Sequence, residues 1–152
     1  MGSEELVGAF GRAMQAYQRA VDTLDQQAAD RLGLNRTDLR CLEMLFGPEA
    51  APMSPGELAT AAGMTTGGVT TAIDRLERAG YVTRERDSGD RRRVTVRPTE
   101  LALRRAGEIY GPVVREGTAF LRRYDDQALA AMIEVLEFAT RQHLDHAARL
   151  AP

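Results

Sequence analysis

The chain has 152 residues, enough for one domain with a buried core, and its formal net charge is −2. It has no run of about 18 apolar residues and no secretion signal, so we expect a soluble cytoplasmic protein that makes no membrane contact. Its single cysteine excludes an internal disulfide framework. Residues 1–74 sum to −5, residues 75–105 to +5 and residues 106–152 to −2, which places the basic surface in the middle segment.

The first segment, residues 3–32, carries apolar side chains every three or four positions. This spacing predicts a long amphipathic helix, which Gly33 ends. About 30 residues span about 45 Å at 1.5 Å per residue, so this helix is longer than is needed to cover the core of a small module. We therefore expect the excess apolar surface to meet a second subunit.

A second helix is predicted from Asn35 to Phe46, with Asn35 or Thr37 as its cap. Cys41 lies inside this helix among apolar neighbours. A lone helical cysteine is most often a small core residue, and a redox sensor built on Cys41 is the alternative.

Residues 54–79 read as helix, tight turn, helix. Ser54 caps the first short helix, Pro55 occupies its first turn and Gly63 closes it. In the second helix, residues 65–79, the packing side is predicted to be Val69, Ala72, Ile73 and Leu76. The opposite side is predicted to be Gly67, Thr70, Thr71, Asp74 and Arg75.

That opposite side suits a helix in the major groove of DNA. Gly67 and Gly68 let the backbone approach a duplex closely, and threonine can meet phosphates, base edges or the thymine methyl. The alternative is an ordinary surface helix with a frayed start.

A β-hairpin follows Gly80. Residues 81–86 and 93–97 alternate as two strands around the turn at residues 87–90. Arg91, Arg92 and Arg93 follow this turn directly, where they could track phosphates or enter the minor groove. Arg92 shares strand parity with the valines of the second strand, and Asp74 is an available partner for it.

Two stretches closely resemble the MarR family of bacterial transcription regulators: DRLERAGYV at residues 74–82 and RDSGDRRRVTVRPT at residues 86–99. The resemblance implies a homodimer that binds a pseudo-palindromic operator, usually as a repressor, and is released by a small, often aromatic ligand or an oxidant. It also implies that Arg92 pairs with Asp74 or reaches the minor groove. The chain departs from the family pattern at Pro98, where the strand should end, and at the two glycines of the reading helix.

Beyond the hairpin, Thr99 caps a helix that Gly111 and Pro112 must kink or break. Asp125 or Asp126 caps a last amphipathic helix. The resemblance places an effector site between the dimerisation helices and the winged module. Its candidate lining residues, for which core packing is the alternative, are Phe10, Met14, Tyr17 and Leu45.

The sequence gives little support for an active site or a metal site. His143 and His146 sit three apart on a helix, but no cysteine or regularly placed carboxylate completes a metal site. The sequence shows no nucleophile paired with a base, and it shows no glycine-rich loop that would bind a phosphate. We therefore expect no enzyme activity and no cofactor.

The expected fold is mainly α with a small β-hairpin wing: a winged helix-turn-helix at residues 35–98 between dimerisation helices at residues 1–34 and 99–152. The alternative functions are a winged-helix module for protein contact and the Cys41 sensor. The expected partners are an operator in double-stranded DNA, a second copy of the chain and a small aromatic effector. The residues predicted to touch DNA are Ser54, Thr65, Thr66, Gly67, Gly68, Thr70, Thr71, Arg75, Arg91, Arg92 and Arg93.

Overall fold

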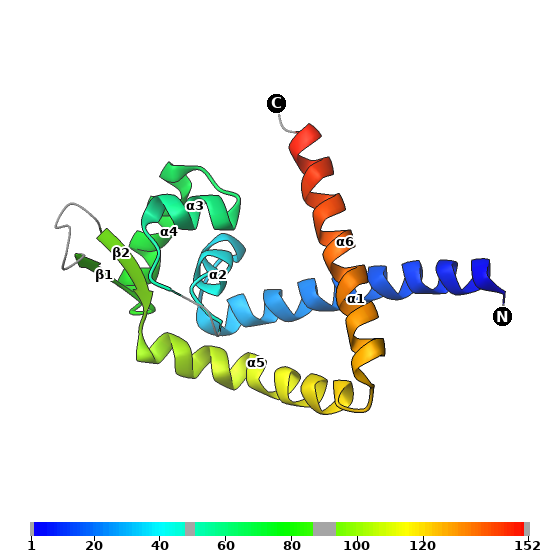
Figure 1. Cartoon of the computed structure of the whole chain (residues 1–152). Helices are drawn as coiled ribbons and strands as arrows, with labels where there is room; N and C mark the ends of the chain where they lie inside the picture. Colours follow the sequence, from blue (N-terminus) through cyan, green and yellow to red (C-terminus); the bar gives the residue numbers. More distant parts are fainter. Residues whose placement is uncertain (1, 48–50, 87–93, 151–152) are drawn as a thin grey trace. The chain divides into compact units, whose positions relative to one another are not determined.

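A computed structural model describes residues 2–47, 51–86 and 94–150. Its elements, in chain order, are α1 (Ser3–Leu32), α2 (Arg36–Glu43), α3 (Pro55–Ala62), α4 (Thr66–Arg78), β1 (Val82–Arg86), β2 (Val94–Pro98), α5 (Glu100–Leu121) and α6 (Asp126–Leu150) (Figure 1). The expected fold, helical with a two-strand antiparallel wing, is confirmed. The chain divides into two compact units, residues 1–109 and 110–152. The finer division at residues 34 and 98 stays a prediction.

The first unit has its core where α2, α3 and α4 meet the end of α1 and the hairpin (Figure 1). The largest fully buried side chains are Leu39, Leu42, Leu45, Leu58, Ile73, Leu76, Val69, Val82, Val96 and Cys41. All four residues predicted for the packing side of α4 are buried. Apolar periodicity therefore identified the face that holds α4 against the rest of the unit.

Capping residues set the helix ends near α4. Asn35 caps α2 by accepting a hydrogen bond from the Asp38 backbone N–H (2.8 Å), and Ser54 forms a reciprocal capping box with Glu57 at the start of α3. Gly63 ends α3 in the left-handed region at φ 64°, a conformation that favours glycine. This turn fixes the step from α3 into α4.

Helix α2 is shorter than predicted, because it ends at Glu43 rather than Phe46. The Leu45 N–H donates to the Leu42 carbonyl (3.0 Å) and the Phe46 N–H donates to the Glu43 carbonyl (3.1 Å). These three-residue bonds tighten the chain into a turn and satisfy carbonyls that the helix leaves unpaired.

The hairpin is held to the rest of the first unit beside the start of β1 and along β2. Strand β1 pairs antiparallel with β2, from Val82 opposite Pro98 to Arg86 opposite Val94, and β2 ends at Pro98 as predicted. The Tyr81 hydroxyl donates to the Leu32 carbonyl at the end of α1 (3.0 Å). Met53 forms a single bridge to Val96, which the sequence did not suggest.

Thr99 caps α5, as expected, by accepting a hydrogen bond from the Ala102 N–H (3.2 Å). Of the two outcomes predicted at Gly111 and Pro112, the break is wrong, because α5 is one helix through Pro112, and the kink stays a prediction. Proline removes one backbone hydrogen bond, but this loss does not end the helix here. Asp125 caps α6 by accepting from the Ala128 N–H (2.8 Å).

The two long terminal helices bury little of their apolar surface. In α1 only Ala28, Ala29 and Leu32 are buried, and no residue of α6 is. Among the helices that the structure describes, none combines the length and apolar character needed to cross a lipid bilayer. Their exposed apolar side chains include Leu6, Phe10 and Tyr17 in α1 and Ile133, Leu136, Phe138 and Leu144 in α6.

Candidate nucleic-acid interface

The outward side of α4 is small and polar. Gly67, Thr70, Thr71 and Asp74 are exposed there, opposite the buried face of the helix. Thr65 caps the helix by accepting from the Gly68 N–H (3.2 Å). A helix presenting this side projects no bulky side chain from its first three turns, so its backbone can come close to a flat or grooved partner.

One flank of α4 is held by an ion pair between the half-buried Arg75 and the buried Asp38. The Arg75 guanidinium donates to both carboxylate oxygens of Asp38 in α2, from Nε (2.8 Å) and Nη2 (2.6 Å). Asp38 is 2% exposed, the one buried charged residue in the described part of the chain, and the Asn35 side chain also donates to it (2.9 Å). The Arg75 pKa is raised above its usual value, chiefly by the hydrogen bond to Asp38. Arg75 was predicted to touch DNA, and this structure shows its guanidinium bound within the protein.

The other flank is held from the hairpin. Arg84 of β1 donates to the carboxylates of both Asp74 and Glu77 on α4. These two acceptors raise the Arg84 pKa, the hydrogen bond to Asp74 most. The sequence analysis missed Arg84, although it shares strand parity with the buried Val82 and so points toward the helix.

Arg91, Arg92 and Arg93 lie outside the described residues. The predicted pairing of Arg92 with Asp74 therefore stays a prediction, while Arg84 already occupies that carboxylate in the described part of the chain. The described strands lead into the arginine segment from Arg86 and out of it at Val94, and β1, the strand before that segment, contacts α4. In the sequence, the three arginines therefore lie between the two strands of the hairpin.

Ser54 and Thr65, also predicted to touch DNA, have capping roles. The Ser54 hydroxyl donates to the Glu57 carboxylate (2.7 Å) and accepts from the Glu57 N–H (3.3 Å). Each hydroxyl stabilises the start of a helix in the helix-turn-helix, so each residue helps to place the turn whether or not it meets a phosphate.

Cys41 is a core residue. It is 0% exposed, and its Sγ lies 3.4 Å from the Met64 sulfur. Burial, reinforced by the Asp38 carboxylate, raises the pKa of its thiol above the ordinary value. Since the thiolate is the form that reacts with oxidants, both effects oppose a sensor role.

The four candidate effector residues are not brought together by one described hollow. Phe10 lines an open apolar hollow along α1 with Leu6 and Val7. Leu45 is buried in the winged core and borders a different hollow that includes Pro52 and Arg97. The effector residues therefore remain predictions.

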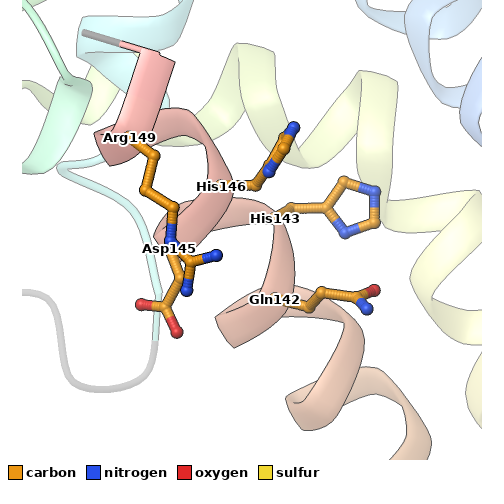
Figure 2. A pocket seen from close by; sticks show the side chains of 5 residues that line it. All are labelled: Gln142, His143, Asp145, His146 and Arg149. Carbon is orange, nitrogen blue, oxygen red and sulfur yellow. The ribbon is translucent and has the colours of Figure 1, made fainter.

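His143 and His146 border a hollow with Gln142, Asp145 and Arg149 on α6, and Figure 2 shows that all five side chains come from this single helix. The His143 Nδ1 lies 2.7 Å from the Ala139 carbonyl oxygen. Across the residues that have described positions, no group of three or more His, Cys, Asp or Glu side chains could hold a metal ion. The histidine pair thus belongs to an open helix surface.

The sequence of this chain is similar to those of known transcription regulators. Residues 32–93 match the family model described as "MarR family". The chain is 41% identical over 104 residues to the uncharacterized HTH-type transcriptional regulator YcgE of Bacillus subtilis, covering 68% of this chain and 66% of YcgE. It is 25% identical over 104 residues to the HTH-type transcriptional repressor YetL of the same organism, covering 68% of this chain and 62% of YetL. The match therefore spans slightly less than two thirds of each relative.

The fold is also that of a solved DNA complex. A mutant of MepR from S. aureus bound to an oligodeoxyribonucleotide superposes with a TM-score of 0.60 at 14% identity, covering 88% of this chain and 96% of that one. At this identity the likeness shows the fold alone. Together with the family match and the identity to YcgE, it makes the assignment plain: the chain belongs to the MarR family of winged helix-turn-helix transcription regulators, a family of regulators rather than enzymes.

Proposed function

We propose that this protein regulates transcription by binding double-stranded DNA, with the outward side of α4 in the major groove and the hairpin arginines on the flanking backbone. The observation that carries the proposal is the small, exposed side of α4, held by ion pairs to α2 and to a hairpin whose two strands are joined in the sequence by a segment with three arginines. Base contacts specify a site and phosphate contacts position the protein on it. The helix and the hairpin supply one kind of contact each.

Charge distribution supports the same use of the molecule. Residues 75–105 carry +5, whereas the segments before and after them carry −5 and −2. Repulsion between phosphates and the acidic segments favours approach through the basic segment. An overall acidic chain can in this way bind DNA with one surface and avoid it with the rest, in the cytoplasm where bacterial DNA lies.

A homodimer is part of the proposal, because α1 and α6 expose apolar side chains that a single chain leaves uncovered. Phe10 is 51% exposed and Phe138 is 60% exposed. Apolar side chains exposed along a helix are typical of an interface, and a two-fold dimer uses the same surface of both copies. Two reading helices related by that symmetry would recognise a pseudo-palindromic operator, with half-sites about 34 Å apart.

Repression relieved by a small aromatic effector is the proposed mode of regulation. The relative YetL is described as a repressor. A repressor bound to an operator that overlaps a promoter prevents RNA polymerase from binding there. An effector that favours a dimer geometry unsuited to the operator would weaken DNA binding by its differential affinity for the two states.

Selection from a pool of duplexes with a randomised central segment tests the proposal. The full chain should enrich a sequence with two inverted half-sites one helical turn apart, and DNA from its own promoter should carry a related sequence. A chain that enriches nothing over several rounds, at low salt and at micromolar concentration, would contradict DNA binding. That outcome would favour the winged helix as a protein-contact module.

A further inference from the structure

The exposed side of α4 begins with Gly67, Thr70 and Thr71, here called the threonine face, and Asp74 and Arg75 follow one turn later. Arg75 is bound to Asp38, and Asp74 is bound to Arg84. The charged side chains beside the threonine face are therefore engaged within the protein. Direct recognition by this part of the helix depends on its three small residues.

Both threonine hydroxyls have already used their single proton. Thr70 Oγ1 donates to the Thr66 carbonyl (2.9 Å), and Thr71 Oγ1 donates to the Gly67 carbonyl (3.0 Å). A hydroxyl has one donor and two acceptor sites. What these side chains offer outward is consequently a methyl group and an acceptor oxygen, with no donor for the acceptor-rich edge of guanine.

The two glycines of α4 differ in what a side chain would meet. A Cβ at Gly68 would lie 3.1 Å from the capping oxygen of Thr65, so the protein's own packing limits that position. A Cβ at Gly67 would meet nothing within 4 Å. Glycine lowers helix propensity relative to alanine, and no described residue lies close enough to position 67 to require a glycine there.

We propose that the threonine face reads thymine: the γ-methyls of Thr70 and Thr71 contact thymine C5-methyl groups in the major groove, and Gly67 allows the α4 backbone to come that close. This rests on the proposed DNA-binding function and names the base class that the helix recognises. The thymine methyl is the apolar feature of the major-groove edge, and a threonine methyl suits it. Arg78, about two turns beyond Thr71, donates from Nε to the Asp74 carbonyl (3.2 Å) and is exposed, so it can supply charge to a phosphate.

Replacing thymine by deoxyuridine provides the test, because it removes the C5-methyl and leaves every hydrogen-bonding group in place. The probe is the duplex enriched from the randomised pool by the full chain, with each thymine of a half-site replaced in turn. Affinity should fall roughly four-fold for each contacted methyl, the equivalent of about 0.8 kcal/mol per buried carbon. Thymines outside the reach of α4 should tolerate the change.

Matched variants assign the effect to the threonine methyls. Thr70→Ser and Thr71→Ser keep the hydroxyl and lose the methyl, and each should abolish the uracil sensitivity of its own position. Thr70→Val and Thr71→Val keep a methyl and lose the hydroxyl, and they should retain that sensitivity. This is a double-mutant cycle between a side chain and a base. Thermal melting confirms that each variant, changed at an exposed position, remains folded.

Gly67→Ala gives an independent readout. The free protein should gain about 2–4 °C in melting temperature, because alanine favours the helix and meets no neighbour. The same variant should bind the enriched duplex more weakly, because its Cβ blocks the close approach.

The outcomes separate this inference from the proposed function. If no duplex is enriched, DNA binding itself fails, and the threonine face with it. If a duplex is enriched but uracil substitution never weakens binding, or if the serine variants keep the uracil sensitivity that the valine variants lose, the thymine inference is overturned while DNA binding stands.

Discussion

Arg75 illustrates how the position of a side chain on a helix can mislead about its role. Helical spacing puts it on the outward side of α4, yet its guanidinium joins α4 to a carboxylate in α2 that is only 2% exposed. No local pattern predicts this pair, because its members are separated by 37 residues and meet only once α2 packs on α4. Sequence analysis identified the packing face of the helix but not the polar contact at its edge.

The pair should respond asymmetrically to mutation. Arg75→Met leaves the buried Asp38 carboxylate without its cation, so we expect the melting temperature to fall by several degrees. Asp38→Asn leaves Arg75 free to turn toward water and should cost less. A buried carboxylate without a cation lowers the free energy of unfolding more than an arginine that can reach water. Thermal unfolding of both variants and of the double variant tests this prediction.

In the double variant the uncompensated carboxylate is gone, so it should be more stable than Arg75→Met alone. Arg78→Met, whose recorded hydrogen bond goes to a backbone carbonyl of its own helix, serves as the control. Equal losses in Arg75→Met and Arg78→Met would contradict a structural role for the pair.

Cys41 should make stability fall in alkaline solution. Its folded pKa is raised above the ordinary value of 9.0, so the folded state keeps its proton where the unfolded chain has lost it. The stabilising contribution is complete below about pH 9 and decreases as the pH rises further, by at most about 1.4 kcal/mol per pH unit. In urea unfolding from about pH 8 to pH 10, the free energy of unfolding should decline, and the decline should be shallower in Cys41→Ala. Comparing the two proteins cancels the effect of the other titrating groups, which they share.

The same burial predicts chemical inertness. A thiol reagent should modify Cys41 slowly in the folded protein and quickly in urea. Rapid modification of the native protein, with loss of DNA binding on peroxide treatment, would restore the sensor hypothesis.

At the scale of elements, the order of helices and strands follows closely from local signals. Glycines, caps and apolar periodicity located every helix, and the alternation of valines located the hairpin. One exception is local, because proline at position 112 favours a break and α5 continues through it. The other exceptions depend on contacts that local signals do not carry. The single bridge from Met53 to Val96 joins residues 43 positions apart, and the last turn of α2 tightens where the chain must leave the core.

The hairpin should depend on Arg84 for its position against α4. Arg84→Gln removes the charge that binds Asp74 and Glu77, and we expect DNA affinity to fall about ten-fold. Stability should change by less than about 1 kcal/mol, because these ion pairs are partly exposed. Anisotropy titration with the enriched duplex, alongside urea unfolding, separates the two effects.

Arg97→Gln is the matched control for Arg84→Gln, since Arg97 pairs with Glu85 across the same hairpin (2.8 Å) and both side chains are half exposed. If the two variants bind DNA equally well, the link from Arg84 to α4 does not position the wing.

For the whole molecule, the exposed apolar side chains of α1 and α6 predict a dimer of the 16.7 kDa chain. The sequence predicts this surface, because the apolar periodicity of both helices continues far beyond what the winged core can cover.

Phe138→Asp places a charge where an aromatic side chain should be buried by the partner, and it should raise the dimer dissociation constant more than about ten-fold. Gln142→Asp, which adds the same charge one turn along α6, should have a smaller effect. Sedimentation of the unmodified chain as a monomer at micromolar concentration would refute the dimer.

The most direct test of DNA binding by α4 and the hairpin is the salt dependence of affinity for the enriched duplex. We compare the natural chain with a variant in which Arg91, Arg92 and Arg93 are alanine, and with a control that replaces the exposed Arg115 and Arg122 of the second unit. The hairpin variant should bind more weakly, and its slope of log affinity against log salt should flatten by about 1 for each lost phosphate contact, while the control keeps its slope. Identical slopes for all three proteins would show that the hairpin does not touch the DNA backbone, and would contradict the account given for this molecule.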